Sequence, residues 1–351
     1  MLFYVLISLS LFLASWALRA QAKVPASVSA IPFVILFLFV AFRYQIGCDW
    51  FGYELHYEMR QGMGFLDIPR IEPLYWTLIS LLDLCGLPYQ SLQVLVSAIF
   101  FISLYRFSSR FSNPILVLAF AFPLFIFALP MSALRQALAA SFIMPAFVCM
   151  VEKKWFSAIA LIAVASQFHV SSFAFIVFPI LMAASYSPLS VAFALLVLVV
   201  AYTNSSFGEA YQVLSDRYAL EVNQASGSLF RSSILSLFGL VARLRVLPFL
   251  RAGMSSGLEA FVGLSSVFMI SFPLLSILSS TVSDRYSYYF AVLLGPIAIL
   301  AYRSAKARGG DYLLLLLIVV IFSFFVLWFF LSYQLQLCYV PYRSVLTFLG
   351  D

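Results

Sequence analysis

Long apolar segments recur along the whole chain, and they limit its possible folds more than any other feature of the sequence. Their lengths approach the roughly 20 residues that a helix needs to cross the hydrocarbon core of a membrane. The segments are 2–18, 31–42, 91–105, 115–129, 155–165, 191–202, 257–280 and 312–331. Backbone polar groups cannot stay unpaired in lipid, and continuous apolarity without alternation selects helices over barrel strands. The sequence therefore predicts an all-α, polytopic integral membrane helical bundle.

The composition agrees with this fold. Hydrophobic residues make up 64% of the chain, charged residues only 10%, and the mean hydropathy is +1.04, whereas a soluble domain is about 25% charged. Segment 2–18 lacks the basic start of a secretory signal, so we interpret it as a retained first span. No soluble domain or low-complexity tail stands out, and residues 1–351 are expected to form a single integral membrane domain. The basic pI reflects loop charges and does not indicate binding to nucleic acid.

The basic residues predict the orientation, because short cytoplasmic loops collect Lys and Arg. One arrangement places all lysines inside, with every outside basic residue an arginine, whose planar group can bind phosphate in a bidentate way. The extracytoplasmic loops are then about 43–72, 204–231 and 332–351. The inside set is Arg19, Lys23, Arg106, Arg110, Lys153, Lys154, Arg243, Arg245, Arg251, Arg303, Lys306 and Arg308. The outside set is Arg43, Arg60, Arg70, Arg135, Arg217, Arg231, Arg285 and Arg343.

Segment 73–87 fits this arrangement only if it does not cross the membrane. It is short, contains Asp83 and ends in Gly86-Leu87-Pro88. We interpret it as an interfacial or re-entrant helix, which leaves about twelve full transmembrane helices. In the alternative it crosses, and the loop 43–72 is cytoplasmic.

The first large loop mixes acidic, basic and aromatic residues between Arg43 and Glu58. This suits a sugar-binding surface, although aromatic residues also gather at any membrane interface. Arg135 is harder to explain, because no other charge lies between Arg110 and Glu152. An unpaired arginine in lipid costs about 2.5–3.5 kcal/mol, so Arg135 either snorkels to the headgroups or contacts an anion. The small residues that follow it would let neighbouring helices pack closely.

His169 lies at the boundary between two apolar segments. A neutral imidazole can take a proton from a hydroxyl near pH 7, and Ser172, three residues later, could orient it on a shared helical face. The alternative is a hydrogen-bonded structural histidine. His56 and His169 provide no spaced ligand set, so no metal site is expected. Arg285 is followed by tyrosines and preceded by Asp284, which could simply neutralise it.

The order of these motifs resembles the Wzy/EpsG-like family of bacterial polysaccharide polymerases over most of the chain. No single motif is specific, but together they occur in the order typical of the family. They are Gly47-x-Asp49-x-x-x-Tyr53, Glu72-Pro73-Leu74-Tyr75, Leu134-Arg135-Gln136-x-Leu138-Ala139, Phe168-His169-x-Ser171-Ser172, Arg285-x-x-x-Tyr289-Phe290 and Val340-Pro341-Tyr342.

The resemblance implies a GT-C-like fold and a reaction at the periplasmic face of the bacterial inner membrane. Oligosaccharide repeat units linked to undecaprenyl diphosphate would be joined into O-antigen, capsule or exopolysaccharide, without a metal or other cofactor. The partners would be this lipid-linked substrate, membrane lipids and, as a candidate, a chain-length regulator, with no nucleic acid.

The same resemblance suggests roles for residues. Arg135 and Arg285 would stabilise the diphosphate leaving group, with Arg43 or Arg343 as helpers. His169 would be the base, with Asp49 as its rival. Sugars would stack on Trp50, Tyr53, Tyr289 and Tyr342. Three further motif residues are assigned to substrate binding: Glu72, Gln136 and Ser172.

Rival functions stay open at this point. An O-antigen ligase would use the same donor with another acceptor, a flippase would carry the lipid-linked glycan across the membrane, and an assembly subunit would catalyse no reaction.

The cysteines suggest one further hypothesis. Cys48 and Cys338 both fall outside, where disulfides are permitted, and they could form a pair.

Overall fold

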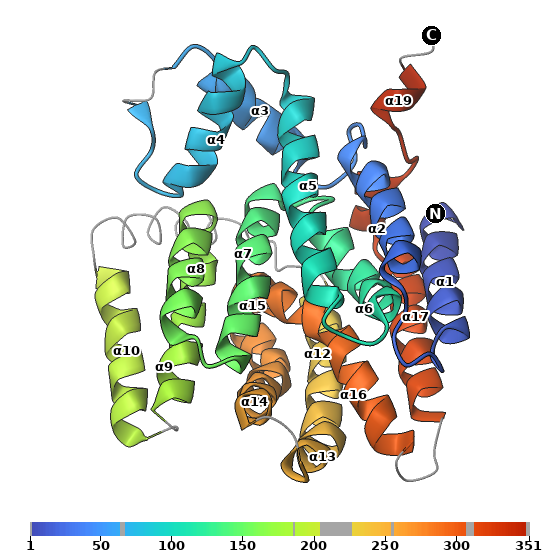
Figure 1. Cartoon of the computed structure of the whole chain (residues 1–351). Coiled ribbons are helices and arrows are strands. Elements are labelled where there is room, and N and C mark those ends of the chain that lie inside the picture. Colours follow the sequence, from blue (N-terminus) through green and yellow to red (C-terminus); the bar gives the residue numbers. More distant parts are fainter. Residues whose placement is uncertain are drawn as a thin grey trace.

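The computed structural model describes residues 2–63, 67–184, 187–203, 227–253, 256–306 and 312–348. Helices dominate this part of the chain, and its extended pairing is limited to a bridge between Arg43 and Ser344. The helices pack side by side, while the short α3 (Trp50–Arg60) and α4 (Pro73–Leu84) stand above one end of the bundle (Figure 1). The predicted all-α bundle is therefore confirmed.

Six helical segments of the described residues are long and apolar enough to cross a membrane. They are α5 (Tyr89–Ser108), α7 (Leu134–Val151), α12 (Ser228–Val241) continued through α13 (Leu247–Arg251), α14 (Ser256–Leu278), α15 (Ser280–Phe290) continued through α16 (Leu294–Lys306), and α17 (Tyr312–Leu331). Shorter helices complete the bundle: α1 (Leu2–Ala17), α2 (Ala26–Ala41), α6 (Pro114–Ala121), α8 (Trp155–Phe168), α9 (Val177–Ala183) and α10 (Pro188–Thr203). The 16 residues of α1 rise only about 24 Å. The count of about twelve full crossings therefore stays a prediction.

Several helices change their winding inside the bundle. α6 continues into a π-helical turn at Phe122–Ile126, which contains Pro123, and a second π-helical turn, Ala242–Val246, joins α12 to α13. The sharpest break follows α8, where His169 is extended and the 3₁₀ helix Val170–Ile176 leads into α9. Irregular backbone at membrane depth is tolerated where protein groups bind its free amides and carbonyls. The break at His169 is therefore a place to look for function.

Small residues allow the close packing that the sequence predicts behind Arg135. Ala137, Ala139 and Ala140 are buried, and Ser103 of α5 donates a hydrogen bond to the Ser141 carbonyl of α7 at 2.6 Å. Elsewhere, a Cβ added to Gly295 of α16 would lie 2.5 Å from the Cα of Val117 in α6. Membrane helices associate through such small-residue contacts because lipid gives no hydrophobic driving force between them.

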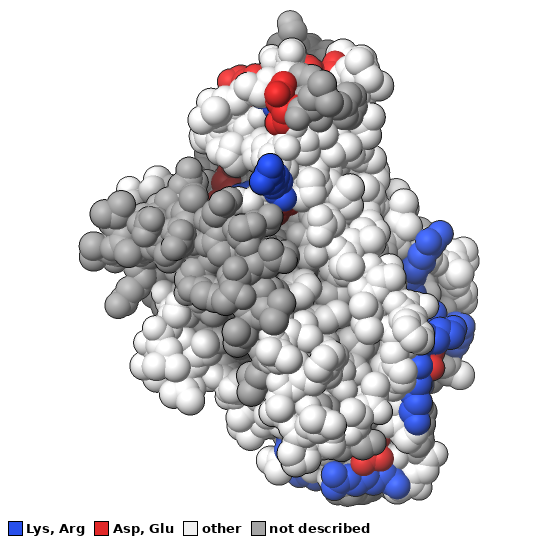
Figure 2. Space-filling model, turned by 90° about the vertical axis from the view of Figure 1, so that its left-hand side faces the viewer, with Lys and Arg blue, Asp and Glu red and all other residues white. Residues whose placement is uncertain are grey.

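The basic segments predicted to be cytoplasmic meet at one end of the bundle. Arg110 pairs with Glu152 at 2.7 Å, Lys153 donates to Ser256, and Ser304 donates to the carbonyl of Arg245. In Figure 2 the basic side chains gather toward the lower end, while acidic side chains lie mainly at the upper end. We call the lower end the basic end. Arg217, Arg308 and most of the expected loop 204–231 lie outside the described residues.

Segment 73–87 does not cross the bundle. Its helix, α4, has 12 residues and stands beside α3, at the end of the bundle where α2 ends and α5 begins (Figure 1). The described parts of this region, residues 42–63 and 67–88, therefore stay at the end opposite the basic end. This is the arrangement expected for an interfacial or re-entrant segment, and the alternative of a crossing helix is not supported.

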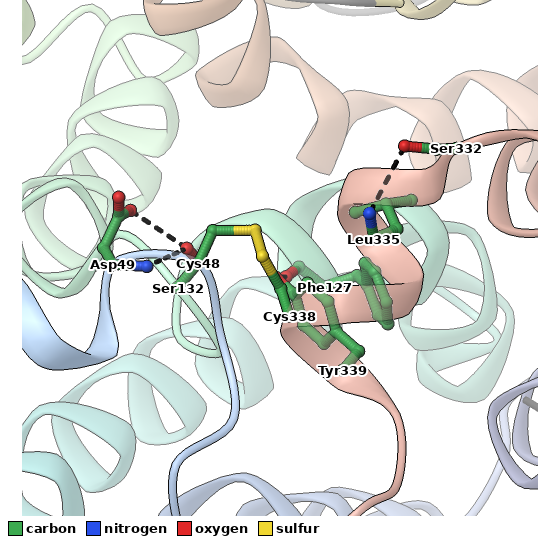
Figure 3. Close-up of a disulfide and its surroundings, with 8 residues drawn as sticks. All are labelled: Cys48, Asp49, Phe127, Ser132, Ser332, Leu335, Cys338 and Tyr339. Carbon is green, nitrogen blue, oxygen red and sulfur yellow. Dashed lines mark hydrogen bonds between the residues drawn. A yellow bond between two sulfur atoms is a disulfide. The ribbon is translucent and has the colours of Figure 1, made fainter.

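A disulfide fixes the loop before α3. Cys48 is bonded to Cys338 in α18 (Tyr333–Tyr339) (Figure 3). Beside this bond, the N–H of Gly47 donates to the Cys338 carbonyl at 2.9 Å. The hypothesis that these two cysteines pair is confirmed. Gly47 has a φ of +108°, and a Cβ there would lie 2.0 Å from the carbonyl oxygen of Met131. Only glycine fits this close approach of two loops.

We predict that Gly47→Ala destabilises the protein and lowers disulfide occupancy. The added methyl group must push the loop away from Met131, and such overpacking costs about 1–3 kcal/mol. Gly52→Ala is the matched control, because a Cβ at Gly52 has no atom within 4 Å. Thermal unfolding in detergent and intact mass with and without reductant measure both effects. Equal behaviour of the two variants would show that the contact at Gly47 does not hold the loop.

Candidate functional site

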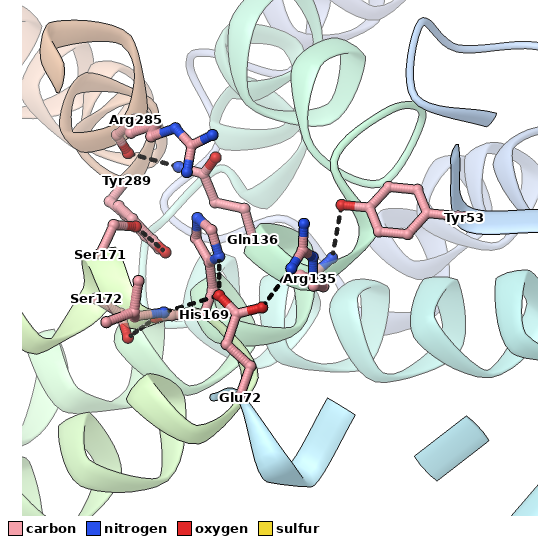
Figure 4. A network of polar contacts seen from close by, with 10 residues as sticks. Tyr53, Glu72, Arg135, Gln136, His169, Ser171, Ser172, Arg285 and Tyr289 are labelled. Carbon is pink, nitrogen blue, oxygen red and sulfur yellow. Dashed lines mark hydrogen bonds and ion pairs between the residues drawn. The ribbon is translucent and has the colours of Figure 1, made fainter. Parts of the chain in front are cut away.

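A buried carboxylate lies at the centre of a polar cluster at the end opposite the basic end. Glu72 directly precedes α4, and only 5% of its surface is exposed. Its Oε2 accepts a hydrogen bond from Arg135 Nη1 at 2.6 Å. Its Oε1 lies 2.7 Å from His169 Nδ1 and accepts from the Val170 N–H at 3.1 Å (Figure 4). Both oxygens are therefore engaged, and three separate elements meet at one side chain.

The backbone brings each partner to this point. Arg135 is in the first turn of α7. His169 sits where α8 ends, and the break into the 3₁₀ helix leaves the Val170 amide available to Glu72. Glu72 itself has a left-handed backbone, with φ at 55°. A non-glycine residue rarely adopts this conformation, and it persists where its surroundings hold it in place.

Electrostatics keep Glu72 ionised. Burial alone would raise the pKa of its carboxyl group, but His169, Arg135 and the hydrogen bonds from His169 and Val170 lower that pKa to about 2. Because an ionised carboxylate can only accept hydrogen bonds, Nδ1 of His169 must carry the proton between them. In the neutral imidazole, Nε2 then has a free lone pair. In Figure 4 this nitrogen points away from Glu72, toward Gln136 and Arg285.

Arg285, in α15, brings a second guanidinium group to the cluster. Its backbone carbonyl accepts a hydrogen bond from Gln136, the neighbour of Arg135. The charge of Arg285 acts on both His169 and Arg135. The charges of Glu72 and Asp49 both act on Arg285. The cluster thus places two guanidinium groups close together, and guanidinium groups are well suited to bind an anionic ligand such as a phosphate.

Aromatic and hydroxyl groups surround the charges. The hydroxyl of Tyr53 accepts the backbone N–H of Arg135 at 3.4 Å, and the rings of Tyr53 and Tyr75 lie 5.8 and 5.7 Å from the Arg135 guanidinium. Ser171 and Tyr289 join their hydroxyl groups at 3.2 Å. The contacts with Tyr53 and Tyr75 hold the arginine in place, and the buried hydroxyl groups of Ser171 and Tyr289 belong to the same cluster.

Asp49 lies at the edge of this cluster. Its Oδ2 accepts a hydrogen bond from Ser132 Oγ at 2.9 Å, and the same hydroxyl accepts the Asp49 N–H at 3.3 Å (Figure 3). The neighbouring disulfide at Cys48 fixes its position. These hydrogen bonds connect Asp49 to Ser132 and not to His169.

The structure does not bring four of the predicted residues to Glu72. Arg43 donates to the carbonyls of Val40 and Ile46 and is buried, which is a structural role. Trp50 packs on Tyr89, Tyr342 stacks on Phe39, and exposed Arg343 donates to Gln45. Ser172 does not orient the imidazole as expected: its hydroxyl donates to the His169 carbonyl, and Glu72 holds the ring instead. The expected shared helical face is absent because α8 ends at Phe168.

Three residues that contact the predicted site residues were not themselves predicted to belong to the site: Tyr75, Ser132 and Ser171. Glu72 was expected only to bind substrate, yet it is the hub of the contacts. One signal pointed to it, because an arginine placed in lipid needs a counter-charge and Glu72 begins an apolar helix. Among the described residues no group of three or more His, Cys, Asp or Glu side chains is placed to hold a metal ion.

The sequence profile of the EpsG family matches residues 28–344, which include the whole cluster. No curated protein and no solved structure matches the chain. The family match covers far more than half of the chain.

We predict that the Glu72 carboxylate makes stability depend on pH. Its pKa falls from 4.5 in the unfolded chain to about 2 in the folded chain, so its contribution is complete above pH 4.5 and is lost as the pH falls through 2. The loss is up to about 3 kcal/mol. Thermal unfolding in detergent from pH 6 to pH 2.5 should show this slope in the wild type and not in Glu72→Gln.

Glu58→Gln removes an exposed carboxylate from α3 and serves as the control. It should keep the wild-type slope. If Glu72→Gln keeps that slope as well, the neighbours of Glu72 do not lower the pKa of its carboxyl group.

Proposed function

Since the chain belongs to the EpsG family of Wzy/EpsG-like polysaccharide polymerases, we propose that it joins oligosaccharide repeat units carried on undecaprenyl diphosphate. The products would be O-antigen, capsule or exopolysaccharide, made at the periplasmic face. The observation that carries the proposal is His169, held by the buried Glu72 and flanked by Arg135 and Arg285. A GT-C-like fold and a chain-length regulator as partner belong to the same proposal.

The geometry supports His169 as the base. Glu72 accepts a hydrogen bond from the Nδ1–H of His169 and so fixes the ring, as an orienting carboxylate does in other nucleophile–base pairs. Nε2 would take the proton from the acceptor sugar hydroxyl as its oxygen forms the bond to the anomeric carbon of the growing chain. Asp49, the rival base, is engaged with Ser132 and so is less favoured.

The arginines support the other half of the reaction. The bond between the anomeric carbon and the diphosphate oxygen breaks, and its electron pair leaves with the diphosphate. Negative charge therefore grows on the leaving group, and guanidinium groups already in position stabilise it. Arg135 keeps its orientation through Glu72 and Tyr53, while Arg285 is anchored through its carbonyl to Gln136.

Two features support the periplasmic side. The disulfide next to Asp49 requires an oxidising compartment, and it lies at the same end as the cluster. The basic segments gather at the opposite end, as the positive-inside rule expects for the cytoplasm. A flippase would need arginines along a path to both faces, whereas this cluster lies at one end. A ligase uses the same donor, so only the acceptor distinguishes it.

We predict that His169→Ala and Arg285→Ala abolish polymer formation in cells that lack the native gene. Loss of a general base lowers a rate about 10²–10⁴-fold, which reduces a ladder of repeat lengths to single-repeat glycan. Arg303→Ala is the matched control, because Arg303 is exposed in the last turn of α16 at the basic end. Glycan electrophoresis gives the readout, and a blot checks expression.

Three results are distinguishable. A ladder that disappears only with the two site variants supports the polymerase and this site. A ladder that survives both variants shows that the site is elsewhere. If cells without the gene still make the ladder but cannot attach it, the protein is a ligase.

A further inference from the structure

A second site lies at the basic end, far from Glu72. The ends of α5 and α7 that lie at the basic end line, with α14 and α16, a cavity of about 240 Å³. Its walls are almost entirely apolar and include Phe111, Phe147, Val262, Ile297 and Leu300. This volume is below the roughly 300–1,000 Å³ typical of compact small-molecule sites. A single flexible hydrocarbon chain fits such a space better than a bulky ligand.

The rim of the cavity is charged. Arg110 and Glu152 line it and pair at 2.7 Å, and Lys154 contacts the other oxygen of Glu152 at 2.7 Å. The side chains of Arg110 and Lys154 are 55% and 63% exposed, so both can also reach a ligand. With two cations for one carboxylate, the rim carries excess positive charge. It therefore complements an anionic headgroup.

The helices that form the walls of the cavity are packed tightly against each other. A Cβ added to Gly257, next to the lining residue Leu258, would lie 2.1 Å from the carbonyl oxygen of Val151, another lining residue. The start of α14 and the end of α7 are thus in direct backbone contact. Deeper in the cavity, Phe147 packs on Phe261 and Phe175. The walls of the cavity are therefore formed by tightly packed helices.

We propose that this cavity binds one acyl chain of an anionic phospholipid, with the headgroup phosphate held by Arg110 and Lys154. Basic pockets between membrane helices on the cytoplasmic side are typical sites for anionic lipid headgroups. The substrate diphosphate is assigned to the opposite end, so this lipid is a structural ligand and not the substrate. The proposal does not depend on the reaction at His169.

Substitution of Ser265 by a larger apolar residue is expected to fill the cavity. Ser265 lines the wall, is buried, and its hydroxyl has no hydrogen-bond partner among the described residues. Replacing it with a larger apolar side chain therefore breaks no hydrogen bond. Val267, two residues later on the same helix, is 53% exposed and outside the cavity lining, so it provides a matched position.

The experiment uses the purified full chain in detergent, titrated with phosphatidylglycerol or with phosphatidylcholine of the same acyl chains. Native mass spectrometry counts retained lipid, and thermal unfolding reports its effect. We expect phosphatidylglycerol to bind at least about tenfold more tightly than phosphatidylcholine and to raise Tm by roughly 3–5 °C. Ser265→Phe and the double variant Arg110→Gln with Lys154→Gln should each lose this preference, while Val267→Phe should keep it.

Each other result overturns the proposal. Equal binding of the two lipids shows that the rim does not select a charge. A preference that survives Ser265→Phe places the lipid outside the cavity. A change of oligomeric state with Ser265→Phe, measured by light scattering, shows that a second copy covers this face. If Ser265→Phe does not fold, Ser265→Leu takes its place in the same comparison.

Discussion

The two hydrogen-bonded oxygens of Glu72 are the contact on which the site depends. A carboxylate buried in a membrane protein must be paired, because its desolvation otherwise costs several kcal/mol. Arg135 and His169 supply that pairing at 2.6 and 2.7 Å, and each partner comes from a different element. Without Glu72, Arg135 would lose its counter-charge and the ring of His169 would lose the contact that sets its tautomer. The packing of this cluster and the proposed chemistry at His169 therefore both depend on one side chain.

The molecule separates its charges by end. Arginines and tyrosines surround Glu72, where a diphosphate and sugars would bind, whereas lysines occur at the basic end beside the apolar cavity. Between these ends the bundle is made of close contacts between small residues and stacked aromatic rings, such as Phe142 on Phe168 directly before His169. Packing of this kind keeps the break after α8 in a fixed position, and the break presents the histidine to Glu72.

The sequence allowed the bundle and its two-sided charge distribution to be predicted, and it suggested the disulfide as a hypothesis. It also drew attention to Arg135 and His169, because polar groups in lipid are costly. It did not reveal the role of Glu72, since that contact spans 63 residues to Arg135 and 97 to His169. It also ranked Arg43 as a ligand-binding residue. A buried arginine needs hydrogen-bond acceptors, and the sequence alone does not show whether backbone carbonyls or a substrate will provide them. In the structure, backbone carbonyls accept the hydrogen bonds of Arg43. The prediction that Ser172 orients the His169 ring was wrong because it assumed that the helix continues past His169. The sequence has no proline or glycine to mark the end of α8 at Phe168.

The disulfide joins residues 290 positions apart, and nearly every membrane-crossing helix lies between them. Its two thiols meet only if Cys48 and Cys338 emerge on the same side, which requires an even number of crossings in between. A chain that skips one helix during insertion leaves the thiols on opposite sides of the bilayer, and they stay reduced. The bond therefore distinguishes chains with an even number of crossings between the two cysteines from chains in which a single helix has failed to insert.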